Sequence, residues 1–213
     1  ILTLLIALPI GVSTAIYFNE YAKKSKFSEV IRYLVDLLTG VPSIIYGLLG
    51  AAVFIPLLNN TVGTAGGSIL SGALTMSVIL LPVIIKSTEE ALKVINVDVR
   101  NASLALGASK TQTTFKVVLP SAVPGMLTGV LLSIGRIIGE SAALIFAIGA
   151  AIKDKIFLSE RATTLAVHIW TIMGGEAPNY ELASAIAIII LIVVVILSIS
   201  VKLIASKLNK AWY

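Results

Sequence analysis

The chain has 213 residues, of which 57% are apolar and 13% are charged, and its formal net charge is +5. Soluble domains contain about 25% charged residues, so this composition excludes an ordinary soluble protein and indicates an integral membrane protein. Its long apolar runs predict an all-α membrane protein. The absence of cysteine excludes disulfides, a single histidine argues against a zinc site, and the scattered basic residues argue against nucleic-acid binding.

Five apolar runs reach the length of about 20 residues that a helix needs to cross a bilayer. The predicted spans are about 1–18, 37–58, 67–86, 122–150 and 182–205. Between them lie polar segments at 19–36, 87–116 and 151–181, and a short turn at 59–67. Because the chain begins inside an apolar run without a basic leader, we expect further helices before residue 1.

The basic residues predict the orientation of the spans. Alternating spans place twelve Lys and Arg residues on one side, in 19–36, 86–120 and the C-terminal tail, and three on the other, in 151–181. Basic loops stay on the inner side of a membrane, so the richer side and the C-terminus are expected to be cytoplasmic.

The run Gly-Val-Pro-Ser at 40–43 interrupts the apolar pattern near the start of the second predicted span. It frees backbone amides and offers the hydroxyl of Ser43. Two interpretations are open: Ser43 faces a substrate path, or a helix simply begins here with Pro near its first turn.

The polar segment at about 97–120 predicts two short helices joined by a bend, which we call the elbow. Asp98 is placed to cap the first helix, which is expected to end just before Gly107, where a left-handed conformation is needed. Ser109 and Gln112 have the spacing of a capping box for the second helix. A plain solvated loop is the alternative.

The fourth predicted span carries Arg136 and Glu140, four residues apart and therefore on one face of a helix. The rest of that face is mostly small: Gly125, Gly129, Ser133, Ala143 and Ala147. Ionisable groups inside a membrane face the bundle interior or a wet cavity, and a guanidinium donates two hydrogen bonds at once to an oxyanion. We predict that Arg136 attracts an anion along a path lined by Ser133, while Glu140 weakens its hold. A structural staple between helices is the alternative.

The polar segment at 151–181 contains apolar residues at helical spacing between Thr163 and Met173, followed by two glycines. This pattern predicts a short interfacial helix that caps the bundle. We expect His168 within it to be a packing or interface residue.

The elbow resembles the coupling-loop motif of ABC importer permeases, which reads E-A-A, three residues, G, nine residues, I, one residue, L-P. Four positions match outright: Ala102, Gly107, Leu119 and Pro120. Val117 is a conservative match, while Asn101 stands in place of the Glu and Ser103 in place of an Ala.

Longer runs are similar to the phosphate-specific importer permeases: FNEYA at 18–22, GVPSIIYGL at 40–48, LALGAS at 104–109 and VVLPSAVPGMLTGVLLSIGR at 117–136. The run TTLAVHIW at 163–170 and the basic tail favour the A-type subunit of that transporter. The resemblance implies a type I importer bundle and a single transmembrane domain over residues 1–213.

The resemblance also implies partners and a location. They are a second phosphate permease subunit, two cytoplasmic ATPase subunits and an extracytoplasmic phosphate-binding protein, assembled in a prokaryotic plasma membrane. The elbow residues implied in ATPase coupling are Asn101, Ala102, Ser103, Gly107, Ala108, Leu119 and Pro120. The predicted path residues are Arg136, Glu140, Ser133 and Ser43.

The chain has no G-x-x-x-x-G-K-[ST] phosphate loop, so ATP is expected to bind a partner subunit and no cofactor is expected here. The implied function is that of a permease subunit in an ATP-driven inorganic phosphate importer, not of an enzyme in its own right. Chemistry alone leaves open a permease for sulfate or molybdate, or a passive anion channel. An intramembrane enzyme is disfavoured because Glu140 is the only acid within a predicted span.

Overall fold

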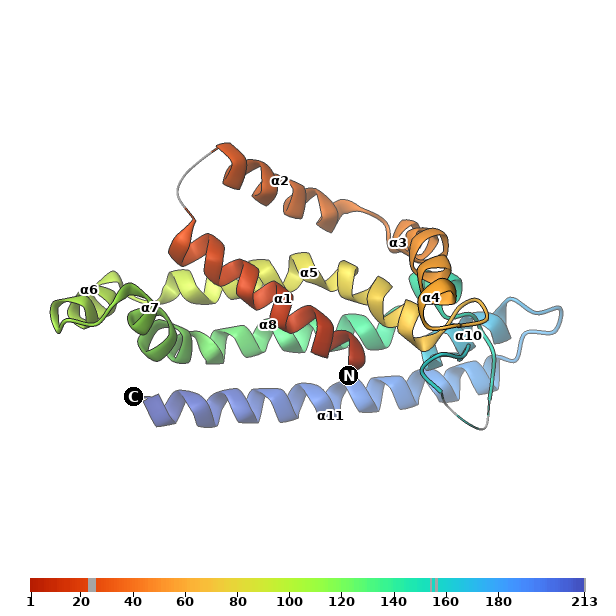
Figure 1. The fold of residues 1–213 in the computed structure, drawn as a ribbon. Coiled ribbons are helices and arrows are strands. Elements are labelled where there is room, and N and C mark those ends of the chain that lie inside the picture. Colours follow the sequence, from red (N-terminus) through yellow and green to blue (C-terminus); the bar gives the residue numbers. More distant parts are fainter. Residues whose placement is uncertain (23–25, 154, 156, 213) are drawn as a thin grey trace.

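The computed structural model describes residues 1–22, 26–153, 155 and 157–212, which form helices and loops without a β-strand. The helices α1 (Leu2–Ile16), α5 (Ile69–Val94), α8 (Leu119–Gly139) and α11 (Tyr180–Trp212) run lengthwise through the described part of the chain (Figure 1). The elbow projects from one end of the bundle, which we call the elbow end. At the opposite end lie α3 (Ser43–Leu49), α4 (Ile55–Thr61), α9 (Ala142–Ala147) and α10 (Leu165–Met173).

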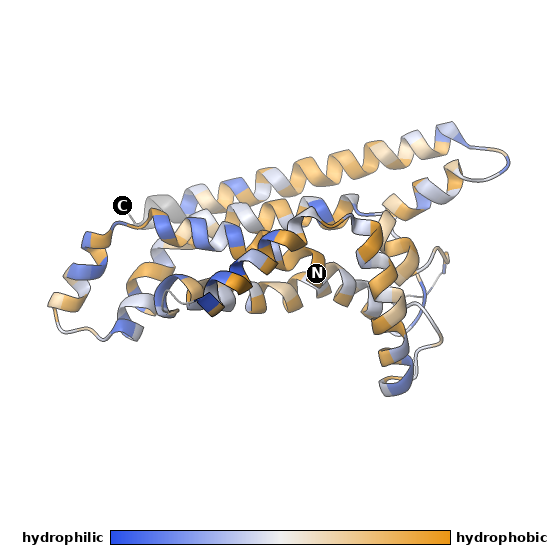
Figure 2. Ribbon diagram, turned by 90° about the horizontal axis from the view of Figure 1, so that it is seen from above, coloured by the Kyte–Doolittle hydropathy of each residue, from blue (hydrophilic) through white to orange (hydrophobic). Residues whose placement is uncertain are grey.

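Within the described residues, five helical segments are long and apolar enough to cross a membrane: Leu2–Tyr21, Ser43–Thr61, Ile69–Val94, Lys110–Gly139 and Tyr180–Lys207. The predicted number of spans is therefore confirmed, and the chain is a multi-pass membrane protein. Hydrophobic residues fill the middle of α11, whereas its two ends are more hydrophilic, as expected of a helix that crosses a bilayer (Figure 2).

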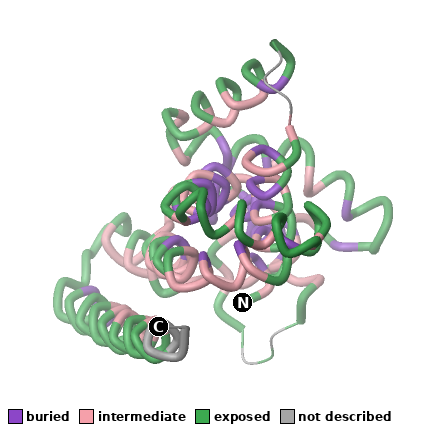
Figure 3. Tube along the Cα trace, turned by 90° about the vertical axis from the view of Figure 1, so that its left-hand side faces the viewer, coloured by how far each residue is buried: buried purple, intermediate pink, exposed green. Residues whose placement is uncertain are grey.

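The most buried helix is α5, which packs against α1 on one side and α8 on another. Its side chains Met76, Leu80 and Leu92 have almost no exposed surface. Ser68 and Ser71 begin the helix with a reciprocal capping box. By contrast, α11 packs against α8 and α10 along one side only, and most of its surface is exposed (Figure 3). The exposed apolar surface of α11 suits contact with lipid or with another membrane subunit.

The second predicted span was misplaced, because the helix over 37–58 is interrupted. One helix, α2 (Lys26–Gly40), ends before Val41, and a separate helix starts at Ser43. Pro42 lacks a backbone N–H and disfavours the helical conformation at the preceding residue, so it favours a break at this point. The span itself is built from α3, one turn of π-helix η2 (Gly50–Phe54) and α4.

The prediction of one continuous helix over 122–150 is also wrong. The helix α8 ends at Gly139, Glu140 is extended with φ −76° and ψ 125°, and a new helix, α9, begins at Ala142. The Glu140 carboxylate accepts a hydrogen bond from the Ala143 N–H at 3.1 Å, which satisfies one of the free amides at the start of α9. The break is thus held by the same charged residue that the sequence pattern assigned to the helix.

The first span is longer than predicted, and the short helix predicted before the last span is present. The first span continues past α1 through one turn of π-helix, η1 (Tyr17–Tyr21). The short helix predicted within the polar segment 151–181 is confirmed as α10, whose Thr164 side chain caps it by accepting from the Val167 N–H. Gly174 follows directly after its last residue.

Replacing Gly129 by Ala should destabilise the bundle by about 1–3 kcal/mol, the usual effect of overpacking. A Cβ at this position of α8 would lie 2.6 Å from the Cβ of Ser87 on α5, so the two helices must separate. The measurement is thermal unfolding in detergent.

The matched control is Gly135→Ala on the same helix, where a Cβ would meet no atom within 4 Å. This change should be neutral or slightly stabilising, because Ala favours a helix over Gly by up to about 1 kcal/mol. Equal melting temperatures for the two variants would contradict the described contact between α8 and α5.

Candidate functional site

The first helix of the elbow is α6 (Val97–Ala105). Its cap is Asn96, whose side chain accepts from the Asp98 N–H at 3.0 Å, so the prediction of Asp98 as the cap is wrong by two residues. Asn96 has the extended backbone of a cap residue, with ψ 137°, whereas Asp98 is already helical. Asp98 still lies in the first turn, where its negative charge is favourable to the helix dipole.

The bend between the two elbow helices is made by Gly107. Its φ is +85°, the left-handed conformation that was predicted, and a side chain is disfavoured there. The Gly107 N–H donates to the Leu104 carbonyl at 3.0 Å, and the Ala108 N–H donates to the Ser103 carbonyl at 3.2 Å. These bonds close the end of α6 and fix the direction in which the chain leaves it.

The second elbow helix is α7 (Lys110–Thr113), and the predicted capping box is confirmed. The Gln112 N–H donates to Ser109 Oγ at 3.2 Å, and the Ser109 N–H donates to Gln112 Oε1 at 2.8 Å. One turn of π-helix, η3 (Thr114–Val118), then continues without a break into α8 at Leu119. The second limb of the elbow and the membrane helix α8 therefore form one continuous helical segment.

A side-chain bridge joins the two limbs of the elbow. The hydroxyls of Ser103 on α6 and Thr113 on α7 lie 2.9 Å apart, within hydrogen-bond distance. Ser103 is the residue that stands in place of an Ala in the coupling-loop pattern. The substitution adds a bond to the bend instead of disturbing it.

The tip of the elbow is exposed and partly apolar. Leu106 is 89% exposed, and Leu104, Asn101 and Ala102 are also exposed. The root is anchored in the bundle, because Val118 is fully buried and Leu119 and Pro120 are half-buried. An exposed leucine at the end of an anchored lever is a surface suited to another protein.

The two charges of the fourth span do not share a helix face. Arg136 lies in the last turn of α8, while Glu140 lies in the break, and within the described residues no ion pair joins them. Both are half-buried. The staple interpretation therefore has no support in this conformation, since the two side chains do not hold two helices together.

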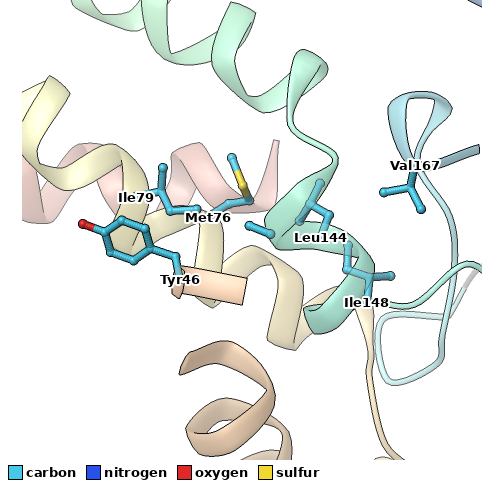
Figure 4. Close-up of a cluster of buried hydrophobic side chains, with 7 residues drawn as sticks. Tyr46, Met76, Ile79, Leu144, Ile148 and Val167 are labelled. Atoms are coloured by element: carbon cyan, nitrogen blue, oxygen red, sulfur yellow. The ribbon is translucent and has the colours of Figure 1, made fainter. Parts of the chain in front are cut away.

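Sequence reasoning missed Tyr46 of α3, which lies within electrostatic range of Arg136. Its hydroxyl donates to the Leu38 carbonyl at 2.6 Å. The ring packs with Met76 and Ile79 in a cluster that continues to Leu144 of α9 (Figure 4). The only signal in the sequence was a hydroxyl-bearing aromatic residue next to the Pro42 break.

The stripe of small residues on α8 faces α5. A Cβ at Gly125 would lie 2.9 Å from the Cβ of Ala91, and Gly129 is closer still to Ser87. Ser133 is fully buried, and its hydroxyl donates back to the Gly129 carbonyl at 2.9 Å. This part of the stripe is a helix contact in this conformation. Ser43 is the half-buried first residue of α3.

Comparison with known proteins identifies the family. A family model described as "binding-protein-dependent transport system inner membrane component" matches residues 7–210. The chain belongs to this family. The match includes the elbow, the break at Glu140 and all of the described membrane spans except the first residues of the first.

Two relatives place the chain more closely. It is 37% identical over 184 residues to the probable ABC transporter permease protein YqgI of Bacillus subtilis, which covers 80% of this chain and 61% of the relative. It is 40% identical over 147 residues to the phosphate transport system permease protein PstA of Mycobacterium leprae, covering 68% of this chain and 46% of the relative. The predicted resemblance to the phosphate-specific permeases is confirmed. The chain spans less than two thirds of the length of these curated relatives.

The fold has counterparts among solved structures. An inward-facing structure of the MetNI methionine ABC transporter matches with a TM-score of 0.74 at 22% identity, covering 97% of this chain and 88% of that chain. At this identity the likeness concerns the fold alone. The predicted type I importer bundle is thereby confirmed.

Replacing Glu140 by Ala should lower stability by about 1 kcal/mol, because the Ala143 N–H loses its capping acceptor. Glu140→Gln keeps an acceptor oxygen at the same reach and should retain most of that stability. Thermal unfolding of both variants in detergent separates the cap from the charge. Equal losses in the two variants would mean that the negative charge, and not the cap, holds the break.

Proposed function

We propose that this chain is a permease subunit of an ATP-driven inorganic phosphate importer. The observation that carries the proposal is the 40% identity to a phosphate transport permease. The rigid elbow supports it, because a transporter driven from outside the membrane needs a lever at which force enters. Family membership shows that the chain is an inner membrane component of a binding-protein-dependent transport system. That phosphate is its substrate, and that it assembles with the partners named below, is what we propose.

The elbow end faces the cytoplasm, where the transporter has two ATPase subunits, and the elbow binds one of them. The exposed Leu106 and Leu104 fill an apolar groove of the ATPase subunit, and Asn101, Ala102 and Ala108 lie beside them. ATP is bound by those subunits, and this chain needs no cofactor of its own. A phosphate-binding protein delivers its ligand at the opposite end, near α10.

A second permease subunit covers part of the apolar surface left open by this chain. The exposed faces of α11 and α2 carry large apolar side chains, among them Leu191 and Leu34. Lipid covers the remainder. The phosphate path lies between the two permeases, so each contributes one wall.

The wall contributed by this chain is centred on Arg136. A guanidinium donates paired hydrogen bonds to a phosphate, and Tyr46 adds a hydroxyl nearby. Glu140, Ser43 and Ser133 complete the proposed path residues, with Ser133 becoming accessible only if α8 moves relative to α5. The helix breaks at Pro42 and Glu140 supply free backbone groups, which a membrane tolerates where they line a cavity or are buried in protein.

Force enters at the elbow and reaches the path through α8. Closure of the ATPase subunits on ATP pushes α6 and α7, and η3 transmits the push because it is continuous with α8. Arg136 lies near the far end of the same helical segment. A rotation at the elbow therefore changes the position of the guanidinium relative to α3.

The substrate assignment is tested with the complete transporter reconstituted in liposomes. ATP hydrolysis should be stimulated by binding protein loaded with phosphate, and phosphate should accumulate in the lumen. Stimulation and uptake with sulfate instead of phosphate would overturn the assignment. Anion flux without ATP would indicate a channel.

Replacing Arg136 by Lys should reduce phosphate uptake about tenfold or more, because Lys keeps the charge but loses the paired donors worth roughly 1.5–3 kcal/mol. Initial rates of radiolabelled phosphate uptake measure the effect. Gly135→Ala, one position earlier on α8, is the control and should transport normally. Unchanged uptake by the Lys variant would remove Arg136 from the path.

Replacing Gly107 by Ala should uncouple ATP hydrolysis from transport, because a side chain strains the left-handed bend by about 1–2 kcal/mol and changes its direction. The measurement is phosphate imported per ATP hydrolysed, which should fall severalfold.

Gly63→Ala is the matched control for the bend. Gly63 also has a positive φ, +75°, with no atom within 4 Å of an added Cβ, but it lies in the turn at the opposite end of the bundle. The two variants should lose similar stability, while only Gly107→Ala loses coupling. A loss of coupling in both would show that strain alone, and not the elbow, is responsible.

A further inference from the structure

The end of the first span contacts the elbow, although about eighty residues of sequence separate the two. The π-turn η1 contains the first four residues of the run FNEYA, and it extends α1 toward the elbow end. Phe18 is buried against α5, so the turn is fixed in the bundle. Glu20 and Tyr21, at the end of the turn, each contact a different limb of the elbow.

The first contact is an ion pair with Arg100 of α6. Arg100 Nη2 lies 3.1 Å from Glu20 Oε1, and the two side chains are only 18% and 9% exposed. The same guanidinium donates to the Ile95 carbonyl at 2.6 Å and to the Leu92 carbonyl at 2.8 Å, both at the end of α5. One side chain therefore joins α6, α5 and η1.

The geometry of Arg100 requires a guanidinium. Its donors reach two carbonyl oxygens and a carboxylate in different directions, which the planar fork of an Arg provides and a Lys ammonium does not match. Because the carboxylate is nearly buried, the attraction is weakly screened by water and salt. Asn19 also donates to Glu20 Oε1, at 2.8 Å, and steadies the acceptor.

The second contact involves the other limb. The Tyr21 hydroxyl donates to Thr111 Oγ1 of α7 at 3.4 Å, and Lys110 Nζ lies 5.3 Å from the centre of the Tyr21 ring. The ammonium is within the range of a cation–π interaction. The two limbs of the elbow are thus both held by one turn of helix.

The chain topology gives these contacts a role. The elbow is joined by the backbone to α5 before it and to α8 after it, whereas α1 has no direct backbone link to it. Ile16 of α1 shares a buried apolar cluster with Val118 at the base of the elbow, and η1 adds the polar contacts that reach α6 and α7. We propose that Glu20 and Tyr21, with Arg100 and Thr111, form a clasp that makes α1 move with the elbow during coupling. This inference rests on the proposed function. Arg100 and Glu20 are positioning residues, because they act through the elbow and touch no substrate.

The clasp extends the reach of the lever to a further helix. Arg32 of α2 donates to the Phe18 carbonyl at 2.7 Å and forms an ion pair with Glu89 of α5 at 2.6 Å. The Arg32 guanidinium also lies 5.0 Å from the centre of the Phe18 ring. Through these contacts, a displacement of η1 would also move α2, the helix that precedes the Pro42 break and Tyr46.

The test measures phosphate imported per ATP hydrolysed by the complete reconstituted transporter. Glu20→Gln removes the charge with little change of shape and should lower this ratio about tenfold, within the range of about 5–150-fold typical of coupling between sites. Arg100→Lys should lower it similarly. Assembly is scored by copurification of the ATPase subunits, and it should persist in both variants.

The control is Glu90→Gln, which removes a carboxylate from the last turns of α5, at the end of the bundle where the clasp lies. Glu90 is exposed and makes no hydrogen bond or ion pair in the described part of the chain, so the ratio should equal that of the wild type. If Glu20→Gln transports with the same ratio as Glu90→Gln, the clasp is overturned. If the wild-type complex hydrolyses ATP without importing phosphate, the proposed function is overturned and the clasp with it.

A rescue experiment distinguishes coupling from simple stability. The chain contains no cysteine, so Tyr21→Cys and Thr111→Cys introduce unique thiols that a short bis-maleimide can bridge. Added to Glu20→Gln in an otherwise cysteine-free transporter, the bridge should restore the import ratio toward that of the wild type. A bridge that forms fully and leaves the ratio low, or that stops ATP-driven import altogether, would overturn the clasp.

Discussion

Close approach of neighbouring helices to α5 is the interaction on which this bundle depends. Gly11 of α1, Gly50 of η2 and Gly129 of α8 each place bare backbone where an added Cβ would collide with an α5 side chain. Inside a membrane there is no general hydrophobic force between apolar helices, so such close packing must favour the assembled bundle. The most buried helix, α5, is consequently also the helix against which several neighbours pack.

A shared, tightly packed helix decides where motion can occur. The spans around α5 cannot slide past it without breaking contacts made at van der Waals distance, and packed interfaces shift between discrete arrangements more readily than they deform. The irregular points lie at the ends: the bend at Gly107, and the breaks at Pro42 and Glu140. In the proposed transporter, a force applied at the elbow would be carried along continuous helix and taken up where regular helix stops.

The sequence predicted those features that depend on residues close together in the chain. Apolar run length gave the number of spans, and the Ser109 capping box and the glycine at 107 gave the elbow its shape. The helix end at Gly139 was missed because an apolar run does not reveal that Glu140 serves as a cap. The pairing of Arg100 with Glu20 was out of reach, since it depends on how α1 packs beside the end of α5. The membrane orientation and the path residues stay predictions.

The exposed leucine at the tip of the elbow has a consequence for the life of the subunit before assembly. An isolated chain displays Leu106 in water, beside a bend whose shape is already set by its own hydrogen bonds. An exposed apolar surface of this kind favours non-specific association until a partner covers it. It is also the kind of feature that chaperones and proteases recognise. If Leu106 is covered by the proposed ATPase subunit, the same residue would distinguish an orphan subunit from an assembled one.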